Sequence, residues 1–143
     1  MKLQQYEIEH LKQLRKLLPE CTVLLKSNGD FPLEQPGKLA LYGSGARYTV
    51  KGGTGSGEVN SRYFVSAERG LLKAGFIVTT NEWLEAYDRI RREAKKQFIR
   101  NIKAQARQKH TNAIVEGMGA VMPEPEYTLP LNGQGDVAVY VLS

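Results

Sequence analysis

The sequence predicts an α/β fold with a mostly parallel open sheet and helices on both faces, an incomplete α/β sandwich. Short apolar and β-branched runs alternate along the chain with longer segments of helical periodicity. This order is typical of parallel strands joined by helices. The chain has 143 residues and is long enough to bury roughly 70% of its unfolded surface.

The first expected element is an amphipathic helix over residues 3–18. Apolar side chains recur there at roughly helical spacing, namely Leu3, Ile8, Leu11, Leu14 and Leu18. Pro19 interrupts this pattern, and we interpret residues 1–21 as an N-terminal helical lead-in. Pro32 and Pro36 keep the next segment extended, because proline and the residue before it disfavour helix.

Three apolar runs are predicted to form strands. Residues 39–42, followed by Gly43, are nearly all apolar, as expected for a strand buried on both faces. Residues 76–80 are rich in β-branched side chains. Residues 137–142 form an apolar run typical of a central parallel strand.

Two helices are predicted between these strands. Ser66 is placed to cap a helix over residues 66–74, which Gly75 ends. Asn81 is placed to cap a long helix that reaches about Gln108. The buried side of this helix is expected to carry Trp83, Leu84, Tyr87 and Ile90.

The net charge of +5 is concentrated in one segment. Residues 89–109 hold nine Lys or Arg residues against the single acid Glu93, whereas the rest of the chain sums to −3. Phosphate-binding surfaces are basic, but this segment has no interleaved aromatic residue beyond Phe98 and no recognition motif. We interpret it as a solvated helix face and expect no nucleic-acid partner. The alternative is a small α/β binding module that uses this helix for nucleic acid or an acidic protein.

The single cysteine, Cys21, excludes an internal disulfide and fits a reducing compartment. We expect it to be a small buried side chain. No apolar run approaches the roughly 18 residues that a membrane span needs, and the N-terminus lacks the apolar core of a secretory signal. We therefore expect a cytoplasmic protein without a membrane partner. His10 and His110 each stand alone, which predicts no metal site.

Residues 43–57 contain six glycines and are predicted to form a loop. The run over residues 52–57 resembles a phosphate cradle, but Glu58 stands where a P-loop has its lysine. The run that starts at Gly43 resembles a dinucleotide fingerprint, but Tyr48 replaces its third glycine. Nucleotide binding is therefore not expected.

Two interpretations of this glycine loop remain. It forms either a tight surface turn or a loop that approaches a ligand closely. In the second case, the hydroxyls of Thr54 and Ser56 and bare backbone amides such as that of Gly55 are the hydrogen-bond donors. Sugar hydroxyls suit such donors.

Several motifs follow one another between residues 22 and 143. The opening segment reads Leu24-Leu25-Lys26-Ser27-Asn28-Gly29-Asp30-Phe31-Pro32-Leu33, and after the first strand come Gly43-Ser44-Gly45-Ala46-Arg47, Lys51-Gly52-Gly53-Thr54-Gly55-Ser56-Gly57 and Val59-Asn60-Ser61-Arg62. In this order and spacing they resemble the α/β sandwich domain of family-3 glycoside hydrolases, the β-glucosidase group. The arrangement looks most like the type in which this domain precedes the barrel domain. The resemblance implies that residues 22–143 are part of such a sandwich domain.

The resemblance also implies retaining hydrolysis of terminal β-linked glucose or a similar sugar by two carboxylates, without a cofactor. It places an aspartate nucleophile in a separate barrel domain and the acid/base glutamate in a segment that follows the strand matching residues 137–142. Both carboxylates are thus expected outside this chain, which we expect to be inactive alone. The implied partners are a β-linked glucoside or oligosaccharide and the barrel-domain polypeptide. Ser56, with Thr54 and Gly55, is the expected sugar contact, whereas Glu124 and Glu126 are interpreted as solvated loop acids.

Overall fold

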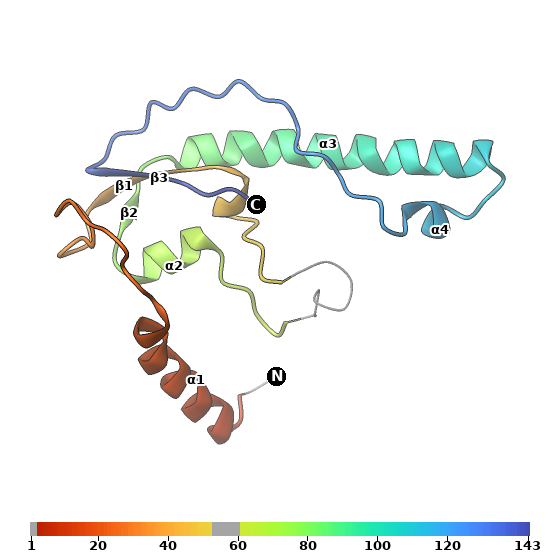
Figure 1. Cartoon of the computed structure of the whole chain (residues 1–143). Coiled ribbons are helices and arrows are strands. Elements are labelled where there is room, and N and C mark those ends of the chain that lie inside the picture. The colour runs from red at the N-terminus through yellow and green to blue at the C-terminus, as the bar shows by residue number, and fades with distance from the viewer. Residues whose placement is uncertain (1–2, 53–60) are drawn as a thin grey trace. The chain divides into compact units, whose positions relative to one another are not determined.

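The computed structural model describes residues 3–52 and 61–143 (Figure 1). The chain forms two compact units, Met1–Gln35 and Pro36–Ser143. The first unit contains the helix α1 (Gln5–Leu17) and the 3₁₀ turn η1 (Leu18–Cys21), so the predicted N-terminal helix is confirmed. Neither element contains a buried residue. Cys21 is exposed, and its predicted burial was wrong because the unit offers no core around it.

Among its described residues, the second unit contains a three-stranded parallel sheet, which confirms the predicted α/β fold. Its strands are β1 (Lys38–Tyr42), β2 (Ile77–Val78) and β3 (Val137–Tyr140), in the order β2-β1-β3. The segment predicted as a strand over residues 76–80 is shorter than expected. The run predicted as a central strand, residues 137–142, instead supplies an edge strand, so that prediction was wrong.

The core is built around β1, where all four residues from Leu39 to Tyr42 are less than 5% exposed. Successive side chains of a strand point to opposite faces, so Leu39 and Leu41 cover one face of β1 while Ala40 and Tyr42 cover the other. Burial on both sides agrees with the prediction for this run. The strand pairs with β2 through Lys38 and Leu39 and with β3 through residues 39–42.

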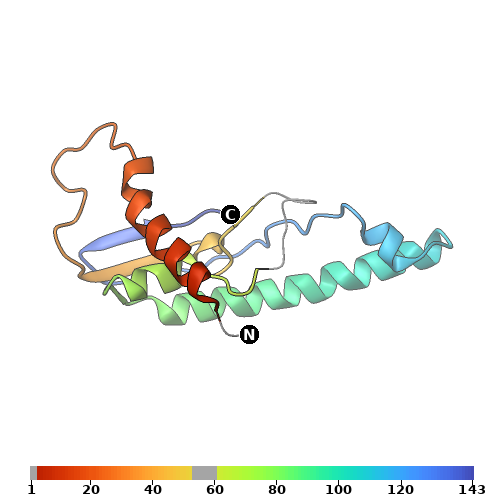
Figure 2. The same cartoon turned by 90° about the horizontal axis from the view of Figure 1, so that it is seen from below.

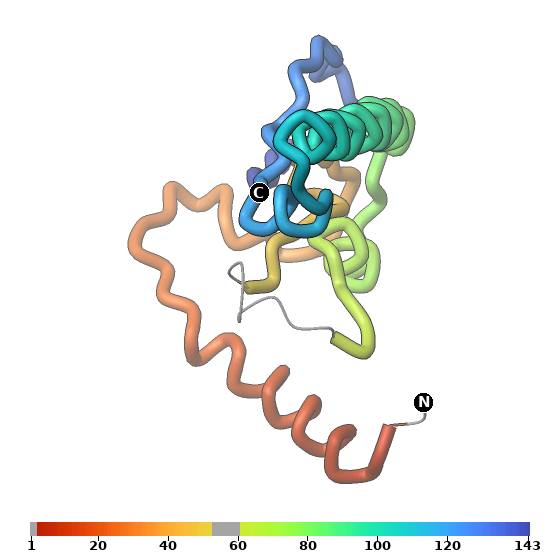
Figure 3. The backbone as a smooth tube through the Cα atoms, turned by 90° about the vertical axis from the view of Figure 1, so that its right-hand side faces the viewer, coloured from red at the N-terminus to blue at the C-terminus, as the bar shows by residue number. Residues whose placement is uncertain are grey.

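Helices cover both faces of this sheet, α2 (Ala67–Lys73) on one face and α3 (Asn81–Gln108) on the other (Figures 1 and 3). The hydroxyl of Ser66 accepts a hydrogen bond from the Arg69 amide and caps α2. Gly75, with φ of +96°, follows the end of α2 in the left-handed region that favours glycine. Both ends of the predicted second helix are therefore confirmed.

The helix α3 extends well past the sheet, and the short helix α4 (Ala113–Gly117) lies beside its far end (Figures 1 and 2). The N-terminal cap of α3 differs from the prediction. Thr80, not Asn81, is the N-cap residue, and no side chain caps this helix. The Thr80 hydroxyl is instead bonded to the backbone of Leu41. Within the described residues, no helix has the length and apolar character that crossing a bilayer requires.

Candidate functional site

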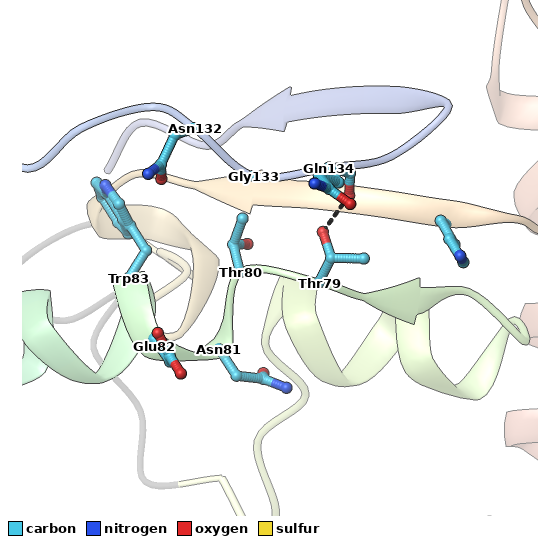
Figure 4. Close-up of a pocket in the computed structure, with 9 residues that line it drawn as sticks. Thr79, Thr80, Asn81, Glu82, Trp83, Asn132, Gly133 and Gln134 are labelled. Carbon is cyan, nitrogen blue, oxygen red and sulfur yellow. Dashed lines mark hydrogen bonds between the residues drawn. The ribbon is translucent and has the colours of Figure 1, made fainter.

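A pocket of about 500 Å³ opens where β2 meets α3. This volume lies within the range of small-molecule sites, roughly 300–1,000 Å³. Three segments meet there: the start of β1, the β2–α3 junction and the stretch that precedes β3 (Figure 4). The lining residues are Lys38, Thr79, Thr80, Asn81, Glu82, Trp83, Asn132, Gly133 and Gln134.

Two threonines at the carboxyl end of β2 fix the floor of the pocket. Thr79 donates its hydroxyl hydrogen bond to the Gln134 carbonyl, which ties the stretch before β3 to the sheet (Figure 4). The Thr80 hydroxyl accepts from the Leu41 amide at 2.9 Å and donates to the Leu41 carbonyl at 2.6 Å. Because both hydroxyls donate to backbone carbonyls, the two threonines position the segments that form the pocket.

Gly133 brings the third segment against the sheet. Its amide donates to the Tyr42 hydroxyl at 2.6 Å. A Cβ added to Gly133 would lie 2.6 Å from that hydroxyl oxygen and even closer to the Thr80 methyl group. Only glycine therefore allows this close approach. Gly133 was not predicted as a site residue; the signal that marks it in the sequence is the polar, glycine-rich run Asn132-Gly133-Gln134-Gly135 just before a strand.

The polar groups around the pocket are chemically mixed. Lys38 offers an ammonium group, Glu82 a carboxylate, and Asn81, Asn132 and Gln134 offer side-chain amides. One positive and one negative charge balance, and the amides provide both donors and acceptors. The first turn of the 28-residue helix α3 also faces the site without a capping side chain. Such a set suits a neutral ligand rich in hydroxyl groups.

An aromatic cluster packs behind the pocket. Trp83, which is 7% exposed, stacks on Tyr87 with 5.7 Å between ring centroids and meets Tyr42 edge-on at 5.3 Å. Tyr127 contacts both Trp83 and Tyr87 edge-on. Edge-on and offset contacts of this kind are favourable beyond the area they bury. The cluster therefore holds the start of α3 rigidly beside the pocket.

The hydroxyls of Tyr87 and Tyr127 in this cluster are hydrogen-bonded and have raised pKa values. Burial, with an added hydrogen bond to the Glu124 carboxylate, raises the pKa of Tyr87. Burial and the hydrogen bond with the Tyr140 hydroxyl raise the pKa of Tyr127 to about 12. Glu124 is exposed in a loop, as predicted, and its carboxylate also accepts a hydrogen bond from the Tyr87 hydroxyl. Glu126 is exposed, as predicted.

The carboxyl ends of β1 and β3 form a second place of interest, because ligands of open α/β sheets bind outside strand carboxyl ends where the strand order reverses. The Gly45 amide donates to the Val141 carbonyl at 2.9 Å, and the Ser143 hydroxyl donates to the Ser44 hydroxyl at 3.2 Å. A Cβ on Gly45 would lie 2.7 Å from a Val141 methyl group, and Gly43 has a φ of +93° against the same strand end. These two glycines therefore serve close backbone packing.

Arg47 links the segment after β1 to both helices. Its guanidinium contacts the Glu68 carboxylate of α2 at 2.9 Å and the Asp88 carboxylate of α3 at 2.7 Å. The hydrogen bonds to Glu68 raise the pKa of Arg47 further above its usual value. All three side chains are less than 25% exposed, so this ion-pair network braces the sheet edge.

The predicted sugar contacts Thr54, Gly55 and Ser56 lie outside the described residues. On either side of them, the Lys51 ammonium donates to the Ser61 hydroxyl at 2.7 Å. The part of the chain that the structure describes contains no group of three or more His, Cys, Asp or Glu side chains that could hold a metal ion.

Comparison of the chain with protein-family models, with curated proteins and with solved structures finds no match in any of the three.

Proposed function

We propose that the second unit is a sugar-binding part of a retaining β-glucosidase-like hydrolase related to family-3 glycoside hydrolases. The observation that carries this proposal is the pocket at the β2–α3 junction, whose balanced charges and three amides suit the hydroxyl groups of a neutral sugar. The parent reaction would be hydrolysis of terminal β-linked glucose or a similar sugar. The order of the motifs around the first strand supports the same class of enzyme. The lone thiol of Cys21 fits the cytoplasmic location expected for this protein.

The number of acidic side chains in the pocket supports a role in binding the sugar and not in carrying out the whole reaction. A retaining glycosidase needs two carboxyl groups about 5 Å apart across the scissile bond. Glu82 is the single acid among the described residues that line the pocket. Under the proposal, the nucleophile and the acid/base come from other segments, and this unit orients the sugar.

The position of the carboxyl end of β3 is consistent with a catalytic carboxylate supplied by another segment. In the family that the sequence resembles, the acid/base segment follows this strand. Here Val141 and Ser143 lie against Gly45 and Ser44 at the carboxyl edge of the sheet, where open α/β sheets gather their ligands. Under the proposal, a carboxylate in a segment that follows this strand lies at that edge.

Tryptophan fluorescence offers a direct test, because Trp83 is the only tryptophan of the chain and lines the pocket. We expect methyl β-glucoside and cellobiose to change the Trp83 emission in a saturable way. Asn132→Ala should weaken this binding at least 5-fold. Asn101→Ala, an exposed amide farther along α3, should leave it within 2-fold. Equal effects of the two variants, or no saturable change with either sugar, would contradict the proposal.

Turnover provides the complementary test. Incubated with an aryl β-glucoside, the isolated chain should release no phenol above the uncatalysed rate, because the described pocket residues supply one carboxylate where the mechanism needs two. Clear hydrolysis that Glu82→Gln abolishes would show that the chain holds a complete catalytic pair.

A further inference from the structure

Six basic side chains form a straight row along α3, which we call the basic stripe. They are Arg89, Arg92, Lys96, Arg100, Lys103 and Arg107. Because an α-helix turns by about 100° per residue, all six positions fall within roughly 80° of each other around the helix axis. The stripe is about 27 Å long at 1.5 Å per residue, with one cation for nearly every helical turn.

The stripe is exposed and largely unneutralised. All six residues are exposed. Within the described part of the chain, Lys96 alone among them has an ion pair, with Glu93 at 2.7 Å. The apolar side of α3, with Trp83 and Tyr87, lies on the opposite side of the helix and packs into the core. Packing within the unit therefore does not account for the stripe.

Mutual repulsion makes this arrangement unfavourable in the isolated chain, since like charges three or four residues apart destabilise a helix. The aromatic cluster at one end and α4 at the other hold α3 in place despite that repulsion. The cations are thus presented on one continuous helix.

The geometry of the stripe favours one class of partner. A strand of duplex nucleic acid completes a turn in about 34 Å, so over 27 Å its phosphates curve away from a straight row. A second copy of this helix would place its own cations against those of the basic stripe, and the two would repel each other. An acidic α-helix matches the row in straightness and in its spacing of about 5.4 Å per turn.

We propose that the basic stripe of α3 docks an acidic α-helix of a partner protein that carries one Glu or Asp per turn along one face. The guanidinium groups of Arg89, Arg92, Arg100 and Arg107 pair with such carboxylates in a forked geometry. Each exposed pair contributes little alone, so affinity depends on several pairs forming in register. This surface is separate from the pocket, and the proposal does not depend on the proposed sugar-binding function.

The test uses the full chain and a fluorescent 21-residue helical peptide with six Glu residues spaced as in the stripe. A second peptide has the same composition, with the six Glu residues distributed around the helix. At about 50 mM salt, fluorescence anisotropy should show at least 10-fold tighter binding of the first peptide. Raising the salt to about 0.5 M should remove that binding, because the interaction is between exposed charges.

Two matched variants locate the binding surface. The stripe variant Arg92→Gln, Lys96→Gln, Lys103→Gln should lose at least 10-fold in affinity. The control variant likewise replaces three exposed cations of α1 by glutamine. The substitutions are Lys12→Gln, Arg15→Gln and Lys16→Gln. This variant lowers the net charge equally and should stay within 2-fold of the unaltered chain. Glutamine is a good helix former, and circular dichroism verifies that both variants keep their helices.

Three outcomes would overturn the proposal. The first is equal binding of the two peptides, which would show that affinity does not depend on aligning the Glu residues with the basic stripe. The second is equal loss in both variants. The third is a 20-base-pair DNA duplex that binds more tightly than the helical peptide and loses affinity in the stripe variant, which would assign the surface to nucleic acid instead.

Discussion

Replacing Gly133 by alanine should destabilise the second unit and disrupt the pocket. The new methyl carbon would lie 2.6 Å from the Tyr42 hydroxyl oxygen and closer still to the Thr80 side chain. Both neighbours are fixed, because Tyr42 is 4% and Thr80 5% exposed. The stretch before β3 must therefore move away from the sheet and lose the hydrogen bond from the Gly133 amide.

The expected loss of unfolding free energy combines two effects. Inserting a methylene-sized group into a packed region costs about 1–3 kcal/mol. Losing this partly buried hydrogen bond costs about 0.5–1.5 kcal/mol. Together they predict about 1.5–4.5 kcal/mol, a large part of the stability of about 5–15 kcal/mol that is usual for a domain. Urea unfolding followed by the emission of Trp83, which is 7% exposed in the folded chain, measures this loss.

Gly70→Ala is the matched control for Gly133→Ala. Gly70 lies inside α2, and a Cβ there would meet nothing within 4 Å. Alanine in a helix interior is more favourable than glycine by about 0.5–1 kcal/mol, so this variant should be more stable than the parent. If Gly133→Ala unfolds within 0.5 kcal/mol of the parent while Gly70→Ala gains stability, the close packing inferred for Gly133 is wrong.

Three further variants test other parts of the second unit. Arg47→Met should lower the unfolding free energy in urea by about 2–3 kcal/mol, because it leaves the Glu68 and Asp88 carboxylates without their cation. Arg47→Lys should recover less than half of this loss. Full recovery by lysine would contradict the forked contact of the guanidinium. Leu41→Ala, at 0% exposure, should cost about 3–5 kcal/mol, and a loss below 1 kcal/mol would place it outside the core. Because the folded pKa of Tyr127 is raised to about 12, the folded state retains a proton there that the unfolded state loses near pH 10. Unfolding free energy should therefore fall as pH rises from 10 to 12, and Tyr127→Phe should flatten this fall relative to the parent.

Local sequence was sufficient for the elements whose signals are local. The apolar run at residues 39–42 predicted a strand buried on both faces, and β1 is that strand. Ser66 and Gly75 marked the ends of α2 because a capping hydroxyl and a left-handed glycine act within a few residues of the helix end. The end of α3 at Gln108 was also predicted.

Features that depend on distant residues could not be predicted in this way. Whether the run at residues 137–140 is central or at an edge depends on which strands flank it, and its own residues do not encode that. The start of α3 lacks a side-chain cap because the Thr80 hydroxyl is bonded to Leu41, a residue 39 positions away that local sequence does not reveal as its partner. Gly43 and Gly45 read as loop glycines because the strand end that they contact lies almost 100 residues later.

The pocket was missed for the same reason. Its lining comes from Lys38, from residues 79–83 and from residues 132–134, and no one of these segments has a recognised binding motif. The sugar contacts expected from the resemblance, Thr54, Gly55 and Ser56, lie outside the described residues, so they stay a prediction.

The pairing of β1 with β3 has a consequence for how the chain reaches its native state. The Lys38 amide bonds to the Asp136 carboxylate across 98 positions, and Ser44 meets Ser143 across 99. The pairing of β1 with β2 involves two residues on each strand. During synthesis, β1 therefore emerges long before its principal partner and has only a minimal strand to pair with. Since non-local strand pairing is slow and leaves apolar edges open to aggregation, Leu39 and Leu41 should need shielding by a chaperone until translation reaches β3.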